Sequence, residues 1–260
     1  MSTPRDWRLP ALRWFDRPAA APSEVEGRRA QGRRAHSRRA TDATLDPRAA
    51  YDLWAPTYPA VAHNPLMRVE QSVVEPLLAR LGALRVLDVG TGSGRYLPVL
   101  RAGGARLVVG IDFSLAMLTR GARTGRVCAD AGSLPFRRST FDLVNASLMV
   151  GDVADLAAWT REMARVLAIG GHLVYSDFHP SWTDRGWRRT FRTRDGALHT
   201  LGFHAHAIED HLAALESAQL RVEAVREPRF KDDREPQVRE FQRRWGNPPV
   251  VVVLHATRDR

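Results

Sequence analysis

The chain has 260 residues, 44% of them hydrophobic, so it is long enough to bury a sizeable core and too apolar for disorder throughout. Its formal net charge of +10 rests on arginine, with Lys231 as the single lysine. That charge favours anionic partners but says little about the fold.

The one cysteine, Cys128, excludes an internal disulfide, and we expect a reducing, cytoplasmic setting. The sequence has no apolar run of the roughly 20 residues that cross a bilayer, and residues 1–10 lack the apolar stretch of a secretory signal.

Residues 1–46 are predicted to be an appendage to the folded domain. They hold ten arginines against six acidic residues, and from Glu24 to Ala40 alanine and arginine dominate without an apolar stripe. Such a composition predicts a disordered or weakly helical segment. The sequence permits either a loose tail or a functional arm here, and chain termini are more often loose.

Ordered structure is predicted to begin near Asp46-Pro47, where an N-cap residue precedes a proline at the first helical position. A helix follows over about 67–81, and from there strands and helices alternate. We expect strands near 84–89, 106–111, 125–128, 141–147 and 171–177, and helices near 93–102, 114–120 and 155–167. A polar stretch over 179–206 precedes a helix at about 207–218, a strand at 220–227 and a last strand at 250–255. This alternation predicts right-handed crossovers and a parallel sheet with helices on both faces.

A glycine-rich turn after the first strand of this series indicates a ligand site. Residues 85–96 read Arg-Val-Leu-Asp-Val-Gly-Thr-Gly-Ser-Gly-Arg-Tyr, so an apolar strand runs into glycines at alternate positions. Glycines let the backbone approach a ligand closely, and the start of the following helix would offer free N–H groups. Dinucleotide-binding enzymes use G-x-G-x-x-G, and the spacing G-x-G-x-G with Arg95 after the third glycine does not match it.

Two acidic residues come where a nucleoside would need them. Asp112 ends the second strand, and Asp130 follows the third. Carboxylates at the carboxyl ends of parallel strands share one edge of the sheet, where open α/β sheets bind ligands. Either residue taken alone could instead cap a helix. Together with Asp88 they favour a nucleoside site with ribose on Asp112 and the adenine amino group on Asp130.

These motifs resemble the class I S-adenosylmethionine-dependent methyltransferases, in particular members that act on small molecules, such as the malonyl-carrier-protein O-methyltransferase group. The resemblance covers about residues 47–178 and rests on 88–94, 111–114, 130–136, 141–144 and 164–171. It implies a doubly wound α/β fold, Rossmann-like, with a seven-stranded mostly parallel sheet of order 3-2-1-4-5-7-6 whose last strand is antiparallel. The implied division is a helical lid over 47–82, a cofactor-binding half over 83–178, an acceptor cap over 179–206, and a final helix and strands over 207–260.

The resemblance also implies residue roles and S-adenosylmethionine as the cofactor. The glycines would pass the methionine portion, and Leu148 would border the sulfonium. Tyr51 and Tyr58 match a Tyr-Asp-x-x-Ala-x-x-Tyr lid of small-molecule members. The residues expected to contact the cofactor are Tyr51, Tyr58, Asp88, Gly90, Thr91, Gly92, Gly94, Asp112, Phe113, Met117, Asp130, Ala131, Asn145 and Leu148.

The acceptor is less well defined by the sequence. Residues 145–148 read Asn-Ala-Ser-Leu, which departs from the Asn/Asp-Pro-Pro-aromatic sequence of enzymes that methylate amino groups of bases or glutamine. We therefore expect a small molecule with a hydroxyl or carboxyl oxygen, with the cap arginines available to an anionic group. His179 is the candidate general base because an imidazole titrates near neutrality, although it could equally cap a turn.

Three functions from different classes remain open at this point. They are a small-molecule methyltransferase, an RNA methyltransferase using the basic residues 1–46 as an arm, and a protein that binds S-adenosylmethionine without transferring its methyl group. His204, His206 and His211 raise the question of a metal, but their alternate spacing is typical of one exposed face of a strand, so we expect none.

Overall fold

The computed structural model describes residues 44–121, 125–185, 187–231 and 234–259. The predicted disordered extension therefore lies outside the described residues, apart from 44–46. Within the described ranges, no helix combines the length and the apolar character needed to span a membrane.

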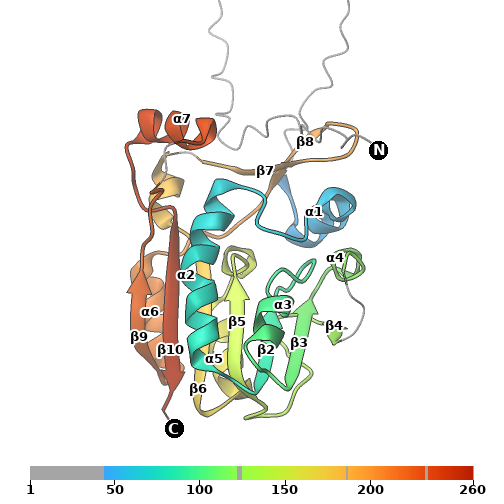
Figure 1. Ribbon diagram of the computed structural model, residues 1–260, viewed down its shortest axis with the longest axis vertical. Coiled ribbons are helices and arrows are strands. Elements are labelled where there is room, and N and C mark those ends of the chain that lie inside the picture. The colour runs from blue at the N-terminus through green and yellow to red at the C-terminus, as the bar shows by residue number, and fades with distance from the viewer. Residues whose placement is uncertain (1–43, 122–124, 186, 232–233, 260) are drawn as a thin grey trace, which may run out of the picture.

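A seven-stranded sheet forms the centre of the molecule (Figure 1). Its order is β4-β3-β2-β5-β6-β10-β9, and β10 runs antiparallel to both of its neighbours. This arrangement confirms the predicted order 3-2-1-4-5-7-6 with an antiparallel last strand. The strands are β2 (Arg85–Val89), β3 (Leu107–Asp112), β4 (Arg126–Cys128), β5 (Phe141–Ser147), β6 (Leu167–Phe178), β9 (Leu220–Arg226) and β10 (Val251–Arg258).

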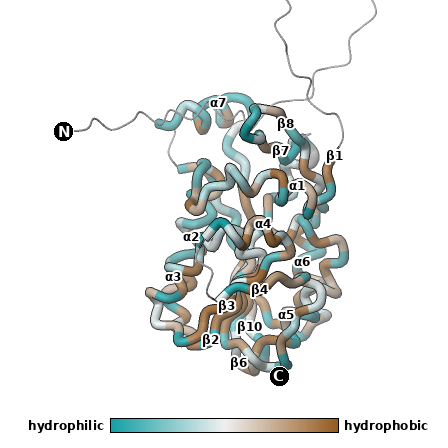
Figure 2. The backbone as a smooth tube through the Cα atoms, turned by 90° about the vertical axis from the view of Figure 1, so that its right-hand side faces the viewer, coloured by the Kyte–Doolittle hydropathy of each residue, from teal (hydrophilic) through white to brown (hydrophobic). Residues whose placement is uncertain are grey.

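Helices cover both faces of the sheet, and two apolar cores lie between the layers. One core packs under α5 (Leu156–Val166) and α6 (Ile208–Ser217); the other packs under α2 (Pro65–Leu81) and α3 (Leu97–Ala102). Figure 2 shows the sheet strands as mainly hydrophobic and α7 (Pro236–Trp245) as mainly hydrophilic. Most residues of β2, β5, β6 and β10 are buried, and their sequences are rich in apolar residues, as is typical of strands that are covered on both faces.

Local sequence signals explain where the first helices begin. Asp46 accepts hydrogen bonds from Arg48 N (3.0 Å) and Ala49 N (3.4 Å), and proline follows at the first position of α1 (Pro47–Trp54). Asn64 caps α2 in the same way, through a 2.8 Å bond from Met67 N to its Oδ1. Side-chain caps of this kind satisfy N–H groups that the first helical turn leaves without partners.

A small second sheet forms a cap above the carboxyl edge of the large one (Figure 1). Its strands are β7 (Arg189–Arg192) and β8 (Leu198–Leu201), which form a hairpin, and β1 (Thr44–Leu45), which pairs in parallel with β8. The cap packs on α1, since Ala50 and Trp54 share a buried cluster with Phe191 and Leu201. The polar stretch over 179–206 thus contains a hairpin that the sequence did not predict, and α7 was not predicted either.

Two expectations about local structure are wrong. The helix expected from residue 93 begins only at Leu97, because Gly94 has φ +91° and the residues before Leu97 form turns. His204 and His206 do not lie on a strand: β8 ends at Leu201, and the chain has no regular structure until α6. The other strands and helices expected along the sheet are present, with ends shifted by a few residues.

A fully buried carboxylate ties α2 to the sheet. Glu70 Oε2 accepts hydrogen bonds from Arg95 Nη1 (2.9 Å) and Tyr96 OH (2.8 Å), and its Oε1 accepts one from Ser176 Oγ (2.9 Å). Glu70 has 0% exposed surface, so these partners replace the water that the charge has lost. The network joins α2, the turn before α3, and β6 at one point.

Replacing Glu70 should therefore destabilise the fold. Glu70→Gln leaves Arg95 without its buried counter-charge, and we expect the free energy of unfolding to fall by about 3 kcal/mol. Glu75→Gln is the matched control on the same helix, where the carboxylate accepts a hydrogen bond from Gln71, and we expect a loss below about 1 kcal/mol. Urea denaturation measures both, and equal stabilities of the two variants would contradict the role given to Glu70.

Candidate functional site

The loop after β2 approaches its surroundings more closely than side chains would allow. Gly90 and Gly92 have φ of +64° and +55°, a region that other residues rarely adopt. A Cβ built on Gly90 would lie 2.7 Å from the Cβ of Met149. The two glycines therefore let the loop pass between β3 and the segment after β5, where it lines a cavity.

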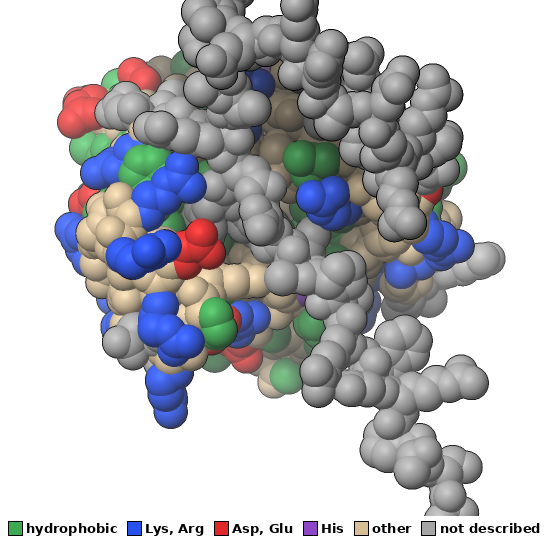
Figure 3. Space-filling view, turned by 90° about the horizontal axis from the view of Figure 1, so that it is seen from above, with side chains coloured by type: hydrophobic (Ala, Val, Ile, Leu, Met, Phe, Trp, Pro, Cys, Tyr) green, Lys and Arg blue, Asp and Glu red, His purple; other side chains and the backbone are tan. Residues whose placement is uncertain are grey.

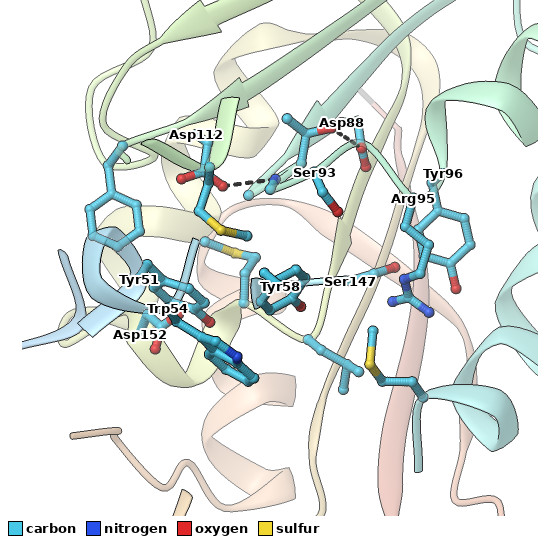
Figure 4. Close-up of a pocket in the computed structure, with 18 of the residues that line it drawn as sticks. Tyr51, Trp54, Tyr58, Asp88, Ser93, Arg95, Tyr96, Asp112, Ser147 and Asp152 are labelled. Atoms are coloured by element: carbon cyan, nitrogen blue, oxygen red, sulfur yellow. Dashed lines mark hydrogen bonds between the residues drawn. The ribbon is translucent and has the colours of Figure 1, made fainter. Parts of the chain in front are cut away.

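Asp112 joins this loop to the end of β3. Its Oδ2 accepts a hydrogen bond from Gly92 N, and its Oδ1 accepts one from Ser114 N, both at 2.8 Å (Figure 4). Burial raises the pKa of Asp112 to about 6, and the two N–H groups oppose that rise. The side chain lines the cavity, so a buried carboxylate of fixed orientation stands at its wall.

Asp88 and Asn145 hold the loop after β2 in place through hydrogen bonds. Asp88 Oδ2 accepts a hydrogen bond from Thr91 Oγ1 (2.6 Å), and its Oδ1 accepts one from Asn145 Nδ2 (2.7 Å). Burial raises the pKa of Asp88, while both hydrogen bonds lower it. Asp88 lines the cavity, whereas Asn145 does not. Asn145 thus reaches the loop through Asp88.

Aromatic side chains from the lid close the cavity on the opposite side. Tyr51 and Trp54 lie on α1, and Tyr58 follows the short 3-10 helix η1 (Ala55–Thr57). Figure 4 shows these three rings grouped across the cavity from Asp112. Tyr51 also packs edge-on against Phe113, with ring centroids 5.9 Å apart. The lid therefore contacts the residue directly after Asp112.

A buried ion pair connects the cap to the cavity. Arg189, on β7, lies 2.7 Å from Asp152 of η2 (Val150–Asp152), and their side chains are 8% and 6% exposed. Arg189 also donates a hydrogen bond to the hydroxyl of Tyr51. Burial raises the pKa of Asp152, and the positive charge of Arg189 opposes that rise. The cap, the lid and the segment after β5 are thus held together by one guanidinium.

The structure brings most of the predicted cofactor residues to this cavity. Those that line it are Tyr51, Tyr58, Asp88, Gly90, Thr91, Gly92, Asp112, Phe113, Met117, Ala131 and Leu148. Gly94, Asp130 and Asn145 do not line it. Asp130 is exposed, and its Oδ1 accepts a hydrogen bond from Gly132 N (2.7 Å), so its predicted contact with adenine stays a prediction.

His179 lies outside the residues that line the cavity. Its Nε2 is 2.8 Å from Glu227 Oε2, and its Nδ1 is 2.9 Å from Ser181 Oγ. Both ring nitrogens thus have protein partners. The predicted role of His179 as general base stays a prediction, and its geometry offers it no direct contact with a molecule in the cavity.

Two of the three histidines considered as metal ligands have structural contacts. His206 Nε2 donates a hydrogen bond to Val153 O at 2.8 Å, and His211 Nδ1 lies 3.2 Å from the hydroxyl of Tyr175. Burial lowers the pKa of His211 to about 4. Among the described residues, no group of three or more histidine, cysteine or acidic side chains has the arrangement of a metal site.

Several cavity residues were not singled out from the sequence. They come from segments far apart in the chain, namely Trp54, His63, Asn64, Met67, Arg95, Tyr96, Ser147, Met149, Asp152, Phe178 and Arg189. Asn64-Pro65 carries the same cap signal as Asp46-Pro47, so its position at a helix start could have been found. Arg189 carries no local signal in a chain so rich in arginine.

The upper face of the molecule carries basic side chains among its described residues. Figure 3 views the molecule from the side of the cap and shows lysine and arginine side chains at several separate positions among the described residues, with acidic ones between some of them.

Comparison with known proteins identifies what the chain resembles. Residues 87–175 match the family model described as Methyltransferase domain. A demethylmenaquinone methyltransferase of Corynebacterium urealyticum is 41% identical over 96 residues, which are 36% of this chain and 41% of that protein. A bifunctional biotin biosynthesis protein of Cellvibrio japonicus is 32% identical over 155 residues, 57% of this chain and 30% of that protein. The chain thus matches less than half the length of these curated relatives.

A solved structure supports the same assignment over more of the chain. The S-adenosylmethionine dependent methyltransferase of Mesorhizobium loti superimposes with a TM-score of 0.55 and 25% sequence identity. The superposition covers 70% of this chain and 96% of that one. The similarity therefore extends beyond the segment that matches the family model.

The raised pKa of Asp112 predicts a specific pH dependence of stability. Its folded value of about 6 lies above the ordinary 3.8, so between these values the folded protein binds more protons than the unfolded chain. The contribution of Asp112 to stability therefore falls as the pH rises from about 4 to about 6, by roughly 3 kcal/mol in all. Asp112→Asn should remove this part of the pH dependence.

Urea denaturation of the ligand-free protein at pH 4 and pH 7 measures the effect. We expect the parent to lose more stability than Asp112→Asn between the two pH values. Asp130→Asn, at an exposed aspartate, is the control and should follow the parent. Parallel pH profiles of the parent and Asp112→Asn would show that Asp112 titrates normally.

Proposed function

We propose that this chain, which belongs to the class I S-adenosylmethionine-dependent methyltransferases, transfers a methyl group to a hydroxyl or carboxyl oxygen of a small molecule. The observation that carries the proposal is the cavity at the carboxyl edge of the sheet. A glycine loop and a buried carboxylate form one of its walls, and the aromatic lid forms another. Such concave sites with a few fixed polar groups are typical of small-molecule binding.

The cavity residues fit S-adenosylmethionine, the cofactor of this family. Gly90 and Gly92 bring backbone close to a ligand where any side chain would collide or be strained. Asp112 presents a buried carboxylate at a strand end, where ribose hydroxyls would bind. Phe113, Met117 and Ala131 provide apolar surface next to it for a base. These residues would hold the nucleoside, and the glycine loop would pass the methionine portion.

Methyl transfer requires mainly that the acceptor is oriented toward the methyl group and that water is excluded. When bound, S-adenosylmethionine supplies an electrophilic methyl group on a sulfonium. Tyr51, Trp54 and Tyr58 cover the cavity, and Arg189 fixes Tyr51 in place from the cap. We propose that these residues hold the acceptor in line with the methyl group and keep solvent away from it.

A hydroxyl acceptor also needs a group that takes its proton. His63 lines the cavity, and its Nδ1 lies 3.3 Å from Val61 O. Because a carbonyl oxygen only accepts, Nδ1 carries the proton and Nε2 is the basic nitrogen of the neutral ring. Burial lowers the pKa of His63, which keeps it neutral at physiological pH. We therefore propose His63 as the general base, with His179 as the residue to compare.

The relatives support an acceptor that contains a planar ring. Demethylmenaquinone methyltransferases are named for a quinone acceptor. The cavity of this chain is rich in aromatic side chains, among them Trp54, Tyr58, Tyr96 and Phe178, which would pack against a planar ring. A ring carbon would then be the alternative methylation site, and after the bond to the methyl group has formed a base must take the proton that this carbon loses.

Binding of the demethylated cofactor tests the first half of the proposal. S-adenosylhomocysteine should raise the melting temperature of the parent protein by several degrees, because a ligand that binds only the folded state stabilises it. Asp112→Ala should largely abolish this shift, whereas Asp195→Ala, in an exposed turn of the cap, should keep it. Absence of a shift in the parent would refute the cofactor site.

The base is tested by turnover. With isotopically labelled S-adenosylmethionine and a metabolite extract as acceptor source, His63→Gln should lower methyl transfer about a hundredfold and leave the affinity for S-adenosylhomocysteine unchanged. His179→Gln should transfer methyl groups close to the parental rate. The reverse order of the two variants would assign the base to His179. Binding of the cofactor without labelled product in the parent would favour a protein that does not transfer the methyl group.

A further inference from the structure

The amide oxygen of Asn64 has a structural function at the start of α2. It is the N-cap of α2, and its Oδ1 accepts a hydrogen bond from Met67 N at 2.8 Å. The residue is 2% exposed and also lines the cavity. A helix cap therefore forms part of the wall of the candidate active site.

The N-cap hydrogen bond fixes which end of the Asn64 amide faces α2. A backbone N–H only donates, so the amide oxygen must face Met67 N and the NH2 group must occupy the other position. The oxygen and nitrogen of this side chain are thus not interchangeable, as they are at many surface asparagines. Nδ2 is buried, and the described part of the chain offers it no hydrogen-bond partner.

A buried donor without a partner is costly, and most native structures avoid it. Leu66, Met67, Trp54 and Tyr58, whose side chains are mainly apolar, line the same cavity as Asn64. A ligand oxygen that accepted the N–H bond would remove the cost. A site of this kind discriminates strongly against an analogue that lacks the matching oxygen.

Unlike the Asn64 NH2 group, the charged groups at the cavity have partners within the protein. Arg189 is paired with Asp152, and Glu70 behind the wall holds Arg95, Tyr96 and Ser176. Their hydrogen-bonding capacity toward a ligand is reduced by these contacts. Asn64 Nδ2 has no such commitment.

We propose that Asn64 Nδ2 donates a hydrogen bond to an oxygen of the methyl acceptor and selects planar ring compounds that carry a carbonyl, phenolic or carboxylate oxygen. The inference rests on the proposed function for the identity of this ligand as the acceptor. The recognition itself depends only on binding and is measured without methyl transfer.

Two variants remove the NH2 donor of Asn64 and keep the N-cap of α2. Asn64→Ser and Asn64→Asp keep a side-chain oxygen for Met67 N, since serine and aspartate are good N-caps, but neither has the NH2 group. Both should keep the melting temperature within a few degrees of the parent. Asp155→Ser is the matched control, because Asp155 caps α5 through a 2.8 Å bond from Ala158 N and does not line the cavity.

The probes are 2-acetylnaphthalene and 2-isopropenylnaphthalene, which differ in carrying a carbonyl oxygen or a methylene group. Equilibrium dialysis with protein saturated by S-adenosylhomocysteine gives the affinity for each. We expect the parent and Asp155→Ser to prefer the carbonyl probe about tenfold, Asn64→Ser to lose that preference, and Asn64→Asp to reverse it through repulsion between oxygens.

A parent protein that shows no preference, or that binds neither probe, overturns the proposal. A preference that persists in both folded Asn64 variants also overturns it. Failure of the proposed function has a different signature, because labelled S-adenosylmethionine would then give no methylated product while the binding preference and its loss in Asn64→Ser remained.

Discussion

The two hydrogen bonds that Asp112 accepts hold the candidate site in shape. They set the distance between the glycine loop after β2 and the turn after β3, and the carboxylate stays buried in doing so. Ser114, whose N–H is one of the donors, also bonds Asp52 of the lid through its hydroxyl at 2.5 Å. The position of α1 over the cavity therefore depends on the same carboxylate. Above pH 6, the buried negative charge of Asp112 lowers the folding stability of the ligand-free protein. Preorganised sites commonly carry such a cost in stability.

The two sides of the cavity are built in different ways. The side with the glycine loop and Asp112 comes from consecutive strand ends of one sheet, so its geometry follows from the fold. The other side is assembled from α1, the start of α2, η2 and the hairpin β7–β8. The guanidinium of Arg189, on the hairpin, contacts Asp152 of η2 and Tyr51 of α1. A buried charge with its partners in two separate segments tolerates little rearrangement. Changes of acceptor among proteins of this fold can thus occur in the cap while the sheet edge stays the same.

The sequence predicts the sheet and the side of the cavity that carries the glycine loop, because both depend on local patterns. Apolar runs, the spacing of Gly90, Gly92 and Gly94, and an acid at the end of β3 are each visible within a few residues. The pairing of Arg189 with Asp152 joins residues that only the folded chain brings together. The late start of α3 follows from the positive φ of Gly94, which the pattern of apolar residues does not encode. Asn64 could be recognised as a cap, but its second role depends on which atoms surround its amide.

The pairing of β1 with β8 has a consequence for the order of folding. Thr44 lies opposite Thr200, so this contact closes a loop that contains the central strands β2 to β6 of the large sheet. Contacts between residues so distant in sequence carry a high entropic cost until the intervening chain has collapsed. We infer that the cap completes after the central strands have formed. A nascent chain would then form the side of the cavity that carries the glycine loop first, and the side that the cap completes would follow.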